Sequence, residues 1–407
     1  MVDSGDTNPV TLASLLCCAA VALADPLALY QQAIAAREQR DFRRFLERTQ
    51  QLTEWAPMNP PMRFLHAEAL AASGKPQQAM AELQWLATNG YHYAFWNRST
   101  FASLSAEREV QTLRARTTRN GQPSGKITQL IRADADLNAE GIDVFEGGWI
   151  AGSMTDGSLN RIEPSGATTV VWRETEPSRR ALGVRNDPRR EVVWACSTGP
   201  DDREPRSELL RVSLKPSAVR RFRMPDARSL CNDVALLPNG AVAVSDSQRG
   251  GVWLLTESGE WRALVAPEVL GYPNGLTYFP PLQRLVVADL RGLWAIDLAG
   301  DIRQVTAPAG TFAGGIDGLY TVGSDLLAIQ NGLRPHRVLR IRIAPATLQV
   351  AGTTVLASNL PELAEMTTAA IGDGNVTVLS ATQAQAAAQP GQRRTLLVQL
   401  SSGSADD

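Results

Sequence analysis

The chain has 407 residues, which is too long for one ordinary hydrophobic core, so we expect one large and one small domain. Its 40 basic and 42 acidic residues give a net charge of -2. The basic residues are scattered rather than gathered into a stripe or a tail, which argues against a nucleic-acid partner.

An apolar run extends from Val10 to Ala24 and ends in the small-x-small pattern that a signal peptidase accepts. We interpret residues 1–24 as an export signal and expect the protein in the periplasm or outside the cell. The segment before the run lacks the positive charge usual in a signal peptide, so a misassigned start and a buried helix are the alternatives. No segment reaches the roughly 20 apolar residues that a membrane helix needs. We therefore expect no membrane span.

Residues 25–116 follow a helical period and form a predicted all-α domain. A turn at Arg40-Asp41 and a second at Gly74-Lys75 are separated by about 34 residues, the period of tetratricopeptide helix pairs. The segment resembles that family in its small and apolar positions, which are Ala67, Leu70, Gly74, Ala79 and Leu83. The resemblance implies a groove for a protein partner. The alternative is a helical cap docked on the neighbouring domain.

After a predicted linker at residues 117–124, the pattern changes to short β runs that continue to residue 401, before a tail at 402–407 that we expect to be disordered. Six units recur at intervals of roughly 40 to 50 residues, which is typical of a propeller. We therefore predict a mainly β fold, with a six-bladed β-propeller over residues 125–401. The strand from Ile127 to Ile131 is expected to pair with the last blade as its outer strand and so close the ring.

Four of the six units begin their innermost strand with a carboxylate or an amide. Such strands all start on the same face of a propeller, so these side chains should converge at one mouth of the channel. Because no Lys or Arg shares this register, the set favours a bound hard cation, Ca²⁺ or Mg²⁺ before Zn²⁺ or Mn²⁺. The four residues are Glu140, Asn232, Asn274 and Asp317, and the corresponding residues of the other two units are Ala181 and Thr367.

With their neighbours these residues read Glu140-Gly141, Asn232-Asp233, Asn274-Gly275-Leu276 and Asp317-Gly318. In this order they resemble the motifs of the gluconolactonase, regucalcin and senescence marker protein family. The resemblance implies that Glu140, Asn274 and Asp317 hold a divalent metal, that Asn232 faces metal and substrate, and that sugar lactones or related cyclic esters are hydrolysed. A cation would polarise the carbonyl, with Asp317 as general base and Glu140 as the alternative base.

One departure from the family concerns the substrate. Leu230 stands where members often have an arginine that contacts substrate hydroxyls, so a less polar lactone or ester fits as well as a sugar lactone. The resemblance also adds Asp289, which follows a Val-Val-Ala strand, as a substrate contact. The segment from Thr198 to Glu208 is either a solvated loop over the cavity or a substrate lid.

Cys196 and Cys231 are expected near the same face of the propeller, either as a disulfide or as two buried thiols. The chain has three histidines, two of them in the helical part, so a histidine-based triad is not expected. We therefore predict an exported, metal-dependent lactonase acting on a small-molecule substrate. The alternative from another class is a non-catalytic protein whose propeller and helical repeats are binding platforms.

Overall fold

The structure is a computed structural model that describes residues 26–104, 108–134, 137–372, 374–381 and 395–401. The predicted export signal and the predicted tail therefore lie outside the described residues. Among the described helices, none is long and apolar enough to cross a membrane.

The N-terminal part contains two helix pairs and a fifth helix. Asp41 caps the second helix by accepting a hydrogen bond from the Arg44 N–H at 3.0 Å, and Asn59 caps the third through the Met62 N–H at 3.1 Å. The fifth helix ends at Asn120, beyond the expected end of the helical domain at residue 116. The helices are α1 (Pro26–Glu38), α2 (Phe42–Trp55), α3 (Pro60–Ala72), α4 (Pro76–Thr88) and α5 (Arg108–Asn120), with short 3-10 turns η1 (Phe95–Asn97) and η2 (Ser99–Leu104).

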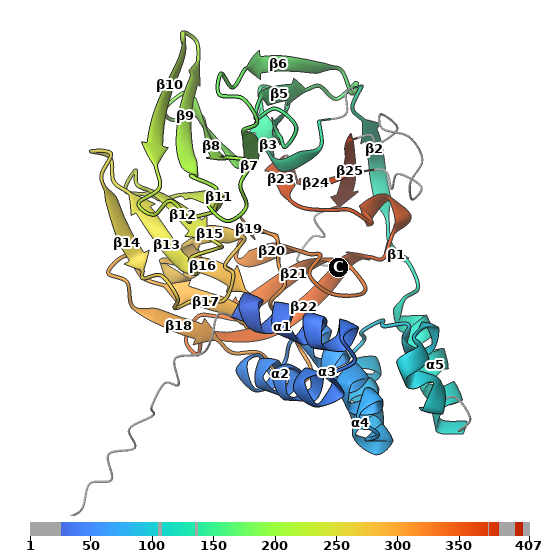
Figure 1. Cartoon of the computed structure of the whole chain (residues 1–407). Coiled ribbons are helices and arrows are strands. Elements are labelled where there is room, and N and C mark those ends of the chain that lie inside the picture. Colours follow the sequence, from blue (N-terminus) through green and yellow to red (C-terminus); the bar gives the residue numbers. More distant parts are fainter. Residues whose placement is uncertain (1–25, 105–107, 135–136, 373, 382–394, 402–407) are drawn as a thin grey trace, which may run out of the picture.

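Six antiparallel sheets form the propeller (Figure 1). Their first strands contact one another in a closed cycle, so the fold is the predicted six-bladed β-propeller. The first three blades are β3 (Ala139–Phe145), β4 (Gly148–Ser153), β5 (Leu159–Ile162) and β6 (Thr168–Trp172); β7 (Arg180–Asp187), β8 (Val192–Thr198), β9 (Glu208–Leu214) and β10 (Ser217–Arg223); and β11 (Cys231–Leu236), β12 (Val242–Asp246), β13 (Gly251–Leu255) and β14 (Trp261–Val265).

The other three blades complete the ring. They are β15 (Leu276–Phe279), β16 (Arg284–Asp289), β17 (Gly292–Ile296) and β18 (Ile302–Val305); β19 (Gly318–Val322), β20 (Asp325–Gln330), β21 (Arg337–Ala344) and β22 (Gln349–Ser358); and β23 (Ala369–Gly372), β24 (Asn375–Ala381), β25 (Thr395–Ser401) and β2 (Ile127–Arg132). Short 3-10 turns η3 (Pro280–Leu282) and η4 (Pro361–Leu363) lie in blade 4 and before blade 6. Second strands such as β4 and β8 are buried throughout, because blades pack on both of their faces.

The ring is closed by the N-terminal strand of the propeller. Strand β2 pairs antiparallel with β25, with Ile127 opposite Leu400 and Ile131 opposite Leu397, as the sequence predicted. Just before it, β1 (Ser124–Gly125) pairs with the outer strand of blade 5. One short segment therefore covers the outer edges of two neighbouring blades, which leaves fewer unpaired backbone groups at the closure point.

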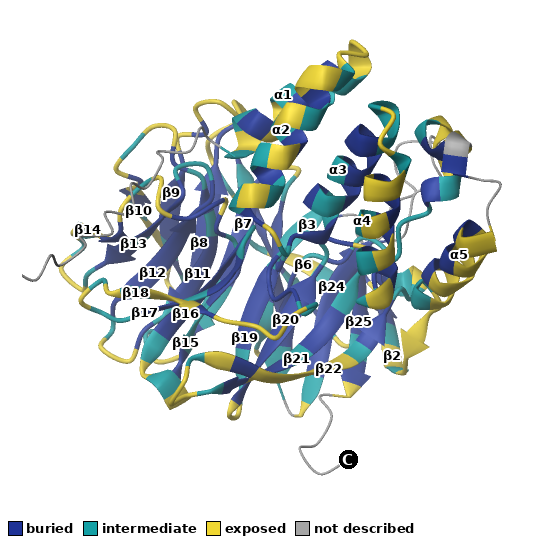
Figure 2. Cartoon of the chain, turned by 90° about the horizontal axis from the view of Figure 1, so that it is seen from below, coloured by how far each residue is buried: buried dark blue, intermediate teal, exposed yellow. Residues whose placement is uncertain are grey.

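The helices lie on one side of the ring (Figure 2). Phe312 and Leu333 of the propeller belong to the same buried apolar cluster as helical residues such as Phe64. Hydrogen bonds reinforce this contact, from Asn59 Nδ2 to the Leu290 carbonyl at 2.8 Å and from the His92 N–H to the Arg334 carbonyl at 2.9 Å. This is the docked arrangement expected of a helical cap.

Candidate functional site at one mouth of the propeller channel

A β-bulge opens the innermost strand of each of the first three blades. The register between first and second strands shifts between Ala139 and Ile142, between Ala181 and Val184, and between Cys231 and Val234. A bulge bends the strand and changes the direction of its side chains, and here it recurs at the candidate positions. The bulged pairs are Glu140-Gly141, Leu182-Gly183 and Asn232-Asp233. Leu182, and not Ala181 as expected, is therefore the residue of blade 2 that is level with Glu140.

The glycines in these motifs are explained by the close approach of neighbouring blades. A Cβ atom on Gly141 would lie 2.2 Å from the Leu182 carbonyl oxygen, and one on Gly275 would lie 2.6 Å from the Asp317 carbonyl oxygen. Neither glycine has a positive φ, so space rather than backbone conformation requires it. The glycines that follow Glu140 and Asn274 therefore let neighbouring inner strands come together around the channel.

Asp317 is the centre of the best-defined contacts. Its Oδ1 accepts a hydrogen bond from Asn274 Nδ2 at 2.7 Å, and its Oδ2 accepts one from Asn331 Nδ2 at 2.6 Å. Burial raises the pKa of Asp317 to about 6, although the two amides act in the opposite direction. The structure thus brings Asn274 and Asp317 together as predicted and adds Asn331, which the sequence indicates only as a turn residue at the end of a strand.

Tyr272 is a site residue that the sequence did not indicate. Burial is the first cause that raises the pKa of its phenol, and the charges of Asp317, Glu140 and Asp202 raise it further, which places Tyr272 close to both predicted carboxylates. Its φ is +56°, a left-handed conformation that is uncommon for a bulky residue and that occurs often at functional sites. The only sequence signal is its position in a Gly-Tyr-Pro-Asn-Gly turn directly before blade 4.

Glu140 and Asn232 are positioned by hydrogen bonds between neighbouring blades. The Thr367 and Thr368 hydroxyls donate to the Glu140 backbone carbonyl at 3.0 and 2.6 Å. Asn232 Nδ2 donates to Ser247 Oγ at 2.8 Å, and Ser247 Oγ in turn donates to the Pro273 carbonyl at 2.5 Å. The Glu140 backbone is therefore tied to the start of blade 6, and Asn232 is tied through Ser247 to the segment before blade 4.

A disulfide joins Cys196 in β8 to Cys231 in β11, with the two Cα atoms 5.3 Å apart. Both cysteines are fully buried. The bridge links blade 2 to blade 3 at the residue directly before Asn232. It therefore fixes the start of the inner strand that carries this candidate side chain.

Asp289, predicted as a substrate contact, has structural contacts in this fold. Its side chain is fully buried and pairs with Arg291 at 2.8 Å. Its oxygens also accept hydrogen bonds from the backbone N–H groups of Gly271 at 2.9 Å and Gly292 at 3.1 Å. Asp246 at the end of β12 has a similar role, because its side chain accepts a hydrogen bond from the Leu230 N–H at 2.9 Å. These carboxylates hold the turns that shape the mouth.

Deeper in the channel, a charged cluster fills the space between the inner strands. Arg185 lies 3.6 Å from an Asp233 oxygen and 4.6 Å above the Tyr320 ring, and its Nε donates to the Val234 carbonyl at 2.9 Å. Burial raises the pKa of Asp233, whereas Arg185 lowers it. The cluster differs from the mouth residues in that its acid has a cationic partner, and the charge of Asp233 also raises the pKa of Asp317.

The residues at the mouth suit a hard cation. Carboxylate and amide oxygens are the ligands that Ca²⁺ and Mg²⁺ prefer, and the polar partners that shift the pKa of half-buried Asp317 are amides and one acid. Among the described residues there is no group of three or more His, Cys, Asp or Glu side chains placed to hold a metal. The predicted set has only two carboxylates, so its other ligands would be amide oxygens.

A cavity of about 890 Å³ opens beside these residues, and Ser247 and Tyr272 connect it to them. Its walls come from α1, from the loop after β8 and from loops of blades 3 and 4. The residues that line it are Pro26, Leu27, Gln31, Asp202, Arg203, Pro205, Leu230, Ser247, Gln248, Arg249, Gly250, Glu268, Leu270 and Tyr272.

No family model matches the sequence, and no curated protein matches it. Among solved structures, the PQQ-bound aldose sugar dehydrogenase of Streptomyces coelicolor is 18% identical with a TM-score of 0.50, over 68% of this chain and 98% of that one. A protein provisionally assigned as a gluconolactonase is 17% identical with a TM-score of 0.47, over 67% and 93%. Virginiamycin B lyase of Staphylococcus aureus is 14% identical with a TM-score of 0.46, over 67% and 98%. At these identities the likeness shows the propeller fold alone.

Proposed function

We propose that this protein is a metal-dependent hydrolase that opens a lactone or a related cyclic ester. The observation that carries the proposal is the half-buried carboxylate of Asp317, which the amides of Asn274 and Asn331 hold without a cationic side chain among the groups that shift its pKa. Burying such a charge is costly unless a positive charge is bound there. A small molecule would reach this carboxylate through the adjoining cavity.

The proposed roles follow from the contacts. Glu140, Asn274 and Asp317 would hold a divalent cation, Ca²⁺ or Mg²⁺ before Zn²⁺ or Mn²⁺, and Asn232 would contact the substrate. When bound, the cation would supply Lewis-acid polarisation of the ester carbonyl. Asp317 would accept a proton from the attacking water, and its raised pKa makes it a stronger base than an exposed carboxylate. Glu140 is the second carboxylate available for this step.

Export to the periplasm or outside the cell is part of the proposal. The buried disulfide between Cys196 and Cys231 supports it, because disulfides persist mainly in oxidising compartments. The apolar run that ends at Ala24 supports the same location.

The test combines calorimetry with Ca²⁺, Mg²⁺, Mn²⁺ and Zn²⁺ and an acid-release assay on a lactone panel. We expect Asp317→Asn and Glu140→Gln to weaken metal binding and to lower kcat/KM by at least about a hundredfold. Asp301→Asn, which changes an exposed carboxylate of blade 4, is the matched control and should behave as wild type. Metal binding without turnover of any ester would favour the alternative of a binding protein. Turnover unchanged in Asp317→Asn would exclude the proposed site.

A further inference from the structure

One part of the wall of the cavity beside the candidate site is apolar, whereas polar and charged side chains line the rest. Leu27 is 42% exposed and Tyr272 is 38% exposed, although large apolar side chains are mostly buried in this fold. Leu230 and Leu270 belong to the same wall. Exposed apolar groups that gather around one hollow mark a binding surface.

The charged groups of the wall balance one another. Asp202 and Glu268 carry negative charge, and Arg203 and Arg249 carry positive charge. These are the charged side chains that line the cavity in the described part of the chain. Arg249 lies 3.3 Å from Glu268, and Asp202 lies 2.8 Å from Arg180. A wall without net charge favours a neutral ligand over a strongly anionic or cationic one.

The loop after β8 is a fixed part of this wall. The Gly199 N–H donates to the Pro205 carbonyl at 2.6 Å, which closes the loop at its base. Gln248 Nε2 donates to the Arg203 carbonyl at 3.1 Å and so ties the loop to blade 3. These bonds fit a preformed wall better than a lid that swings open.

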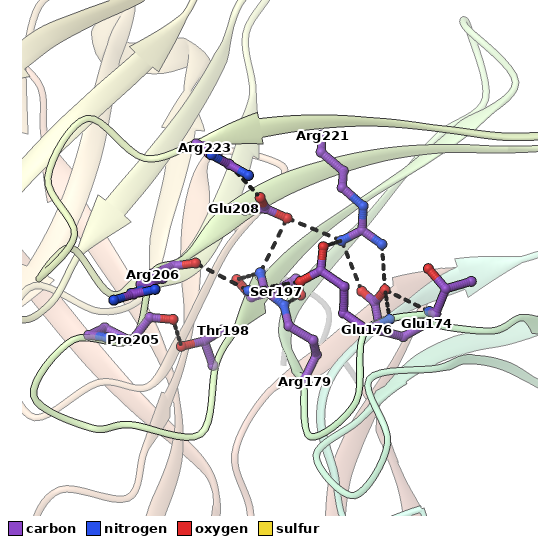
Figure 3. A network of polar contacts seen from close by, with 11 residues as sticks. Glu174, Glu176, Arg179, Ser197, Thr198, Pro205, Arg206, Glu208, Arg221 and Arg223 are labelled. Carbon is purple, nitrogen blue, oxygen red and sulfur yellow. Dashed lines mark hydrogen bonds and ion pairs between the residues drawn. The ribbon is translucent and has the colours of Figure 1, made fainter.

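A buried ion-pair network supports the base of the loop (Figure 3). The Arg179 guanidinium donates to the Ser197 carbonyl at 3.2 Å and to the Arg206 carbonyl at 3.3 Å. It also pairs with Glu208 at 3.4 Å, and Arg221 reaches the same carboxylate at 3.1 Å. Buried and paired charges of this kind fix geometry, because separating them would leave an uncompensated charge.

The opposite wall belongs to the helical domain. Helix α1 contributes Leu27 and Gln31 to the cavity. The corner between α2 and α3 is anchored on the propeller, since Asn59 bonds to Leu290 and Trp55 lies so close to Gly271 that a Cβ there would come within 2.2 Å of its ring. Gly271 directly precedes Tyr272, so the docked helices and the cavity share one segment of chain.

We propose that the substrate is a neutral, amphipathic lactone or ester with an apolar substituent, and that helix α1 forms part of its binding pocket. This inference rests on the proposed hydrolase function. The ester group would lie near Ser247 and Tyr272, next to the candidate carboxylates, and the substituent would extend along Leu27 and Leu230. The cavity volume of about 890 Å³ is near the upper end of the range of small-molecule sites, roughly 300–1,000 Å³, and exceeds the need of an unsubstituted lactone ring.

The test uses the full chain and a series of γ-lactones that differ only in alkyl length: γ-butyrolactone, γ-octalactone and γ-dodecalactone. We expect kcat/KM to rise by at least about tenfold from the first to the last, because each added methylene gains binding in an apolar pocket. Leu27→Ser and Leu230→Ser should each reduce this gain about tenfold. Val355→Ser replaces a 47% exposed apolar residue on the outer strand of blade 5 and is the control.

The outcomes separate this inference from the proposed function. Hydrolysis that does not depend on chain length, or a gain that survives both variants, would overturn the apolar pocket and leave the hydrolase proposal intact. If no lactone is hydrolysed, calorimetry with the corresponding alkyl γ-lactams decides. Chain-length-dependent binding that Leu27→Ser weakens would support the pocket without the hydrolase, and absence of such binding would overturn it.

Discussion

At the scale of single residues, Asp317 combines partial burial with hydrogen-bond partners that carry no positive charge. Its folded-state pKa of about 6 lies above the ordinary value of 3.8, so the ionised form is less stable in the folded chain than in the unfolded chain. The ionised Asp317 side chain therefore lowers the free energy of unfolding of the metal-free protein at neutral pH. That cost decreases as pH falls through about 6 and is gone below 3.8, where both states are protonated.

We predict that Asp317→Asn stabilises the metal-free protein at pH 7 by up to about 3 kcal/mol, since one pKa unit corresponds to about 1.4 kcal/mol. The advantage over wild type should shrink as pH is lowered from 7 toward 4. Urea unfolding in the presence of EDTA measures both effects. A loss of stability in the variant at pH 7 would mean that the charge is compensated within the protein itself.

At the scale of strands and motifs, the glycines after Glu140 and Asn274 keep neighbouring inner strands in contact. We predict that Gly141→Ala lowers the free energy of unfolding by about 1–3 kcal/mol, because the added methyl group would overlap the Leu182 carbonyl. Gly352→Ala is the matched control, since a Cβ at that strand position meets nothing within 4 Å. Equal effects of the two substitutions, measured by urea unfolding, would contradict the close-approach explanation.

The bridge between β8 and β11 should also contribute at this scale. Replacing Cys196 and Cys231 together by alanine is expected to lower the free energy of unfolding by roughly 2–4 kcal/mol, because the bridge closes a loop with a sequence separation of 35. Unfolding curves of wild type with and without reductant, beside the double variant, provide the measurement. Reductant should not affect the double variant, and a wild type that is equally insensitive to it would argue against the bridge.

The recurring pairs at strand starts made the blades predictable from sequence. The spacing of the units and the residues that begin them were enough to predict the six-bladed ring and its closure by β2. The contacts of individual side chains could not be predicted, because they depend on loops that approach from other blades. Asp289 thus holds a turn, Tyr272 takes a left-handed backbone conformation that no periodicity encodes, and Asn331 contacts Asp317 from the segment after β20. The bulge, which moved the blade 2 position from Ala181 to Leu182, has no sequence signal of its own.

At the scale of the whole molecule, the helical domain and the propeller share a core. Phe312 is 5% exposed and belongs to the cluster that includes helical residues of α3 and α4. We predict that the full chain unfolds in one calorimetric transition and that Phe312→Ala separates it into two, with the helical part unfolding first. A cavity left by a buried phenylalanine costs about 3–5 kcal/mol. Two transitions already in wild type would show that the shared cluster does not couple the domains.

The closure of the ring by β2 has a consequence for biosynthesis. This strand leaves the ribosome early, whereas its partner β25 lies at the far end of the described chain. At synthesis rates of about 5–20 residues per second, β2 must remain unpaired for some tens of seconds. The helical domain faces the same delay, because the blades on which it docks follow it along the chain. A nascent protein of this design exposes an unpaired strand and an uncovered apolar helix face at the same time: the helix face can be covered once the segments with Leu290, Phe312 and Leu333 have been made, whereas β2 waits for the last blade.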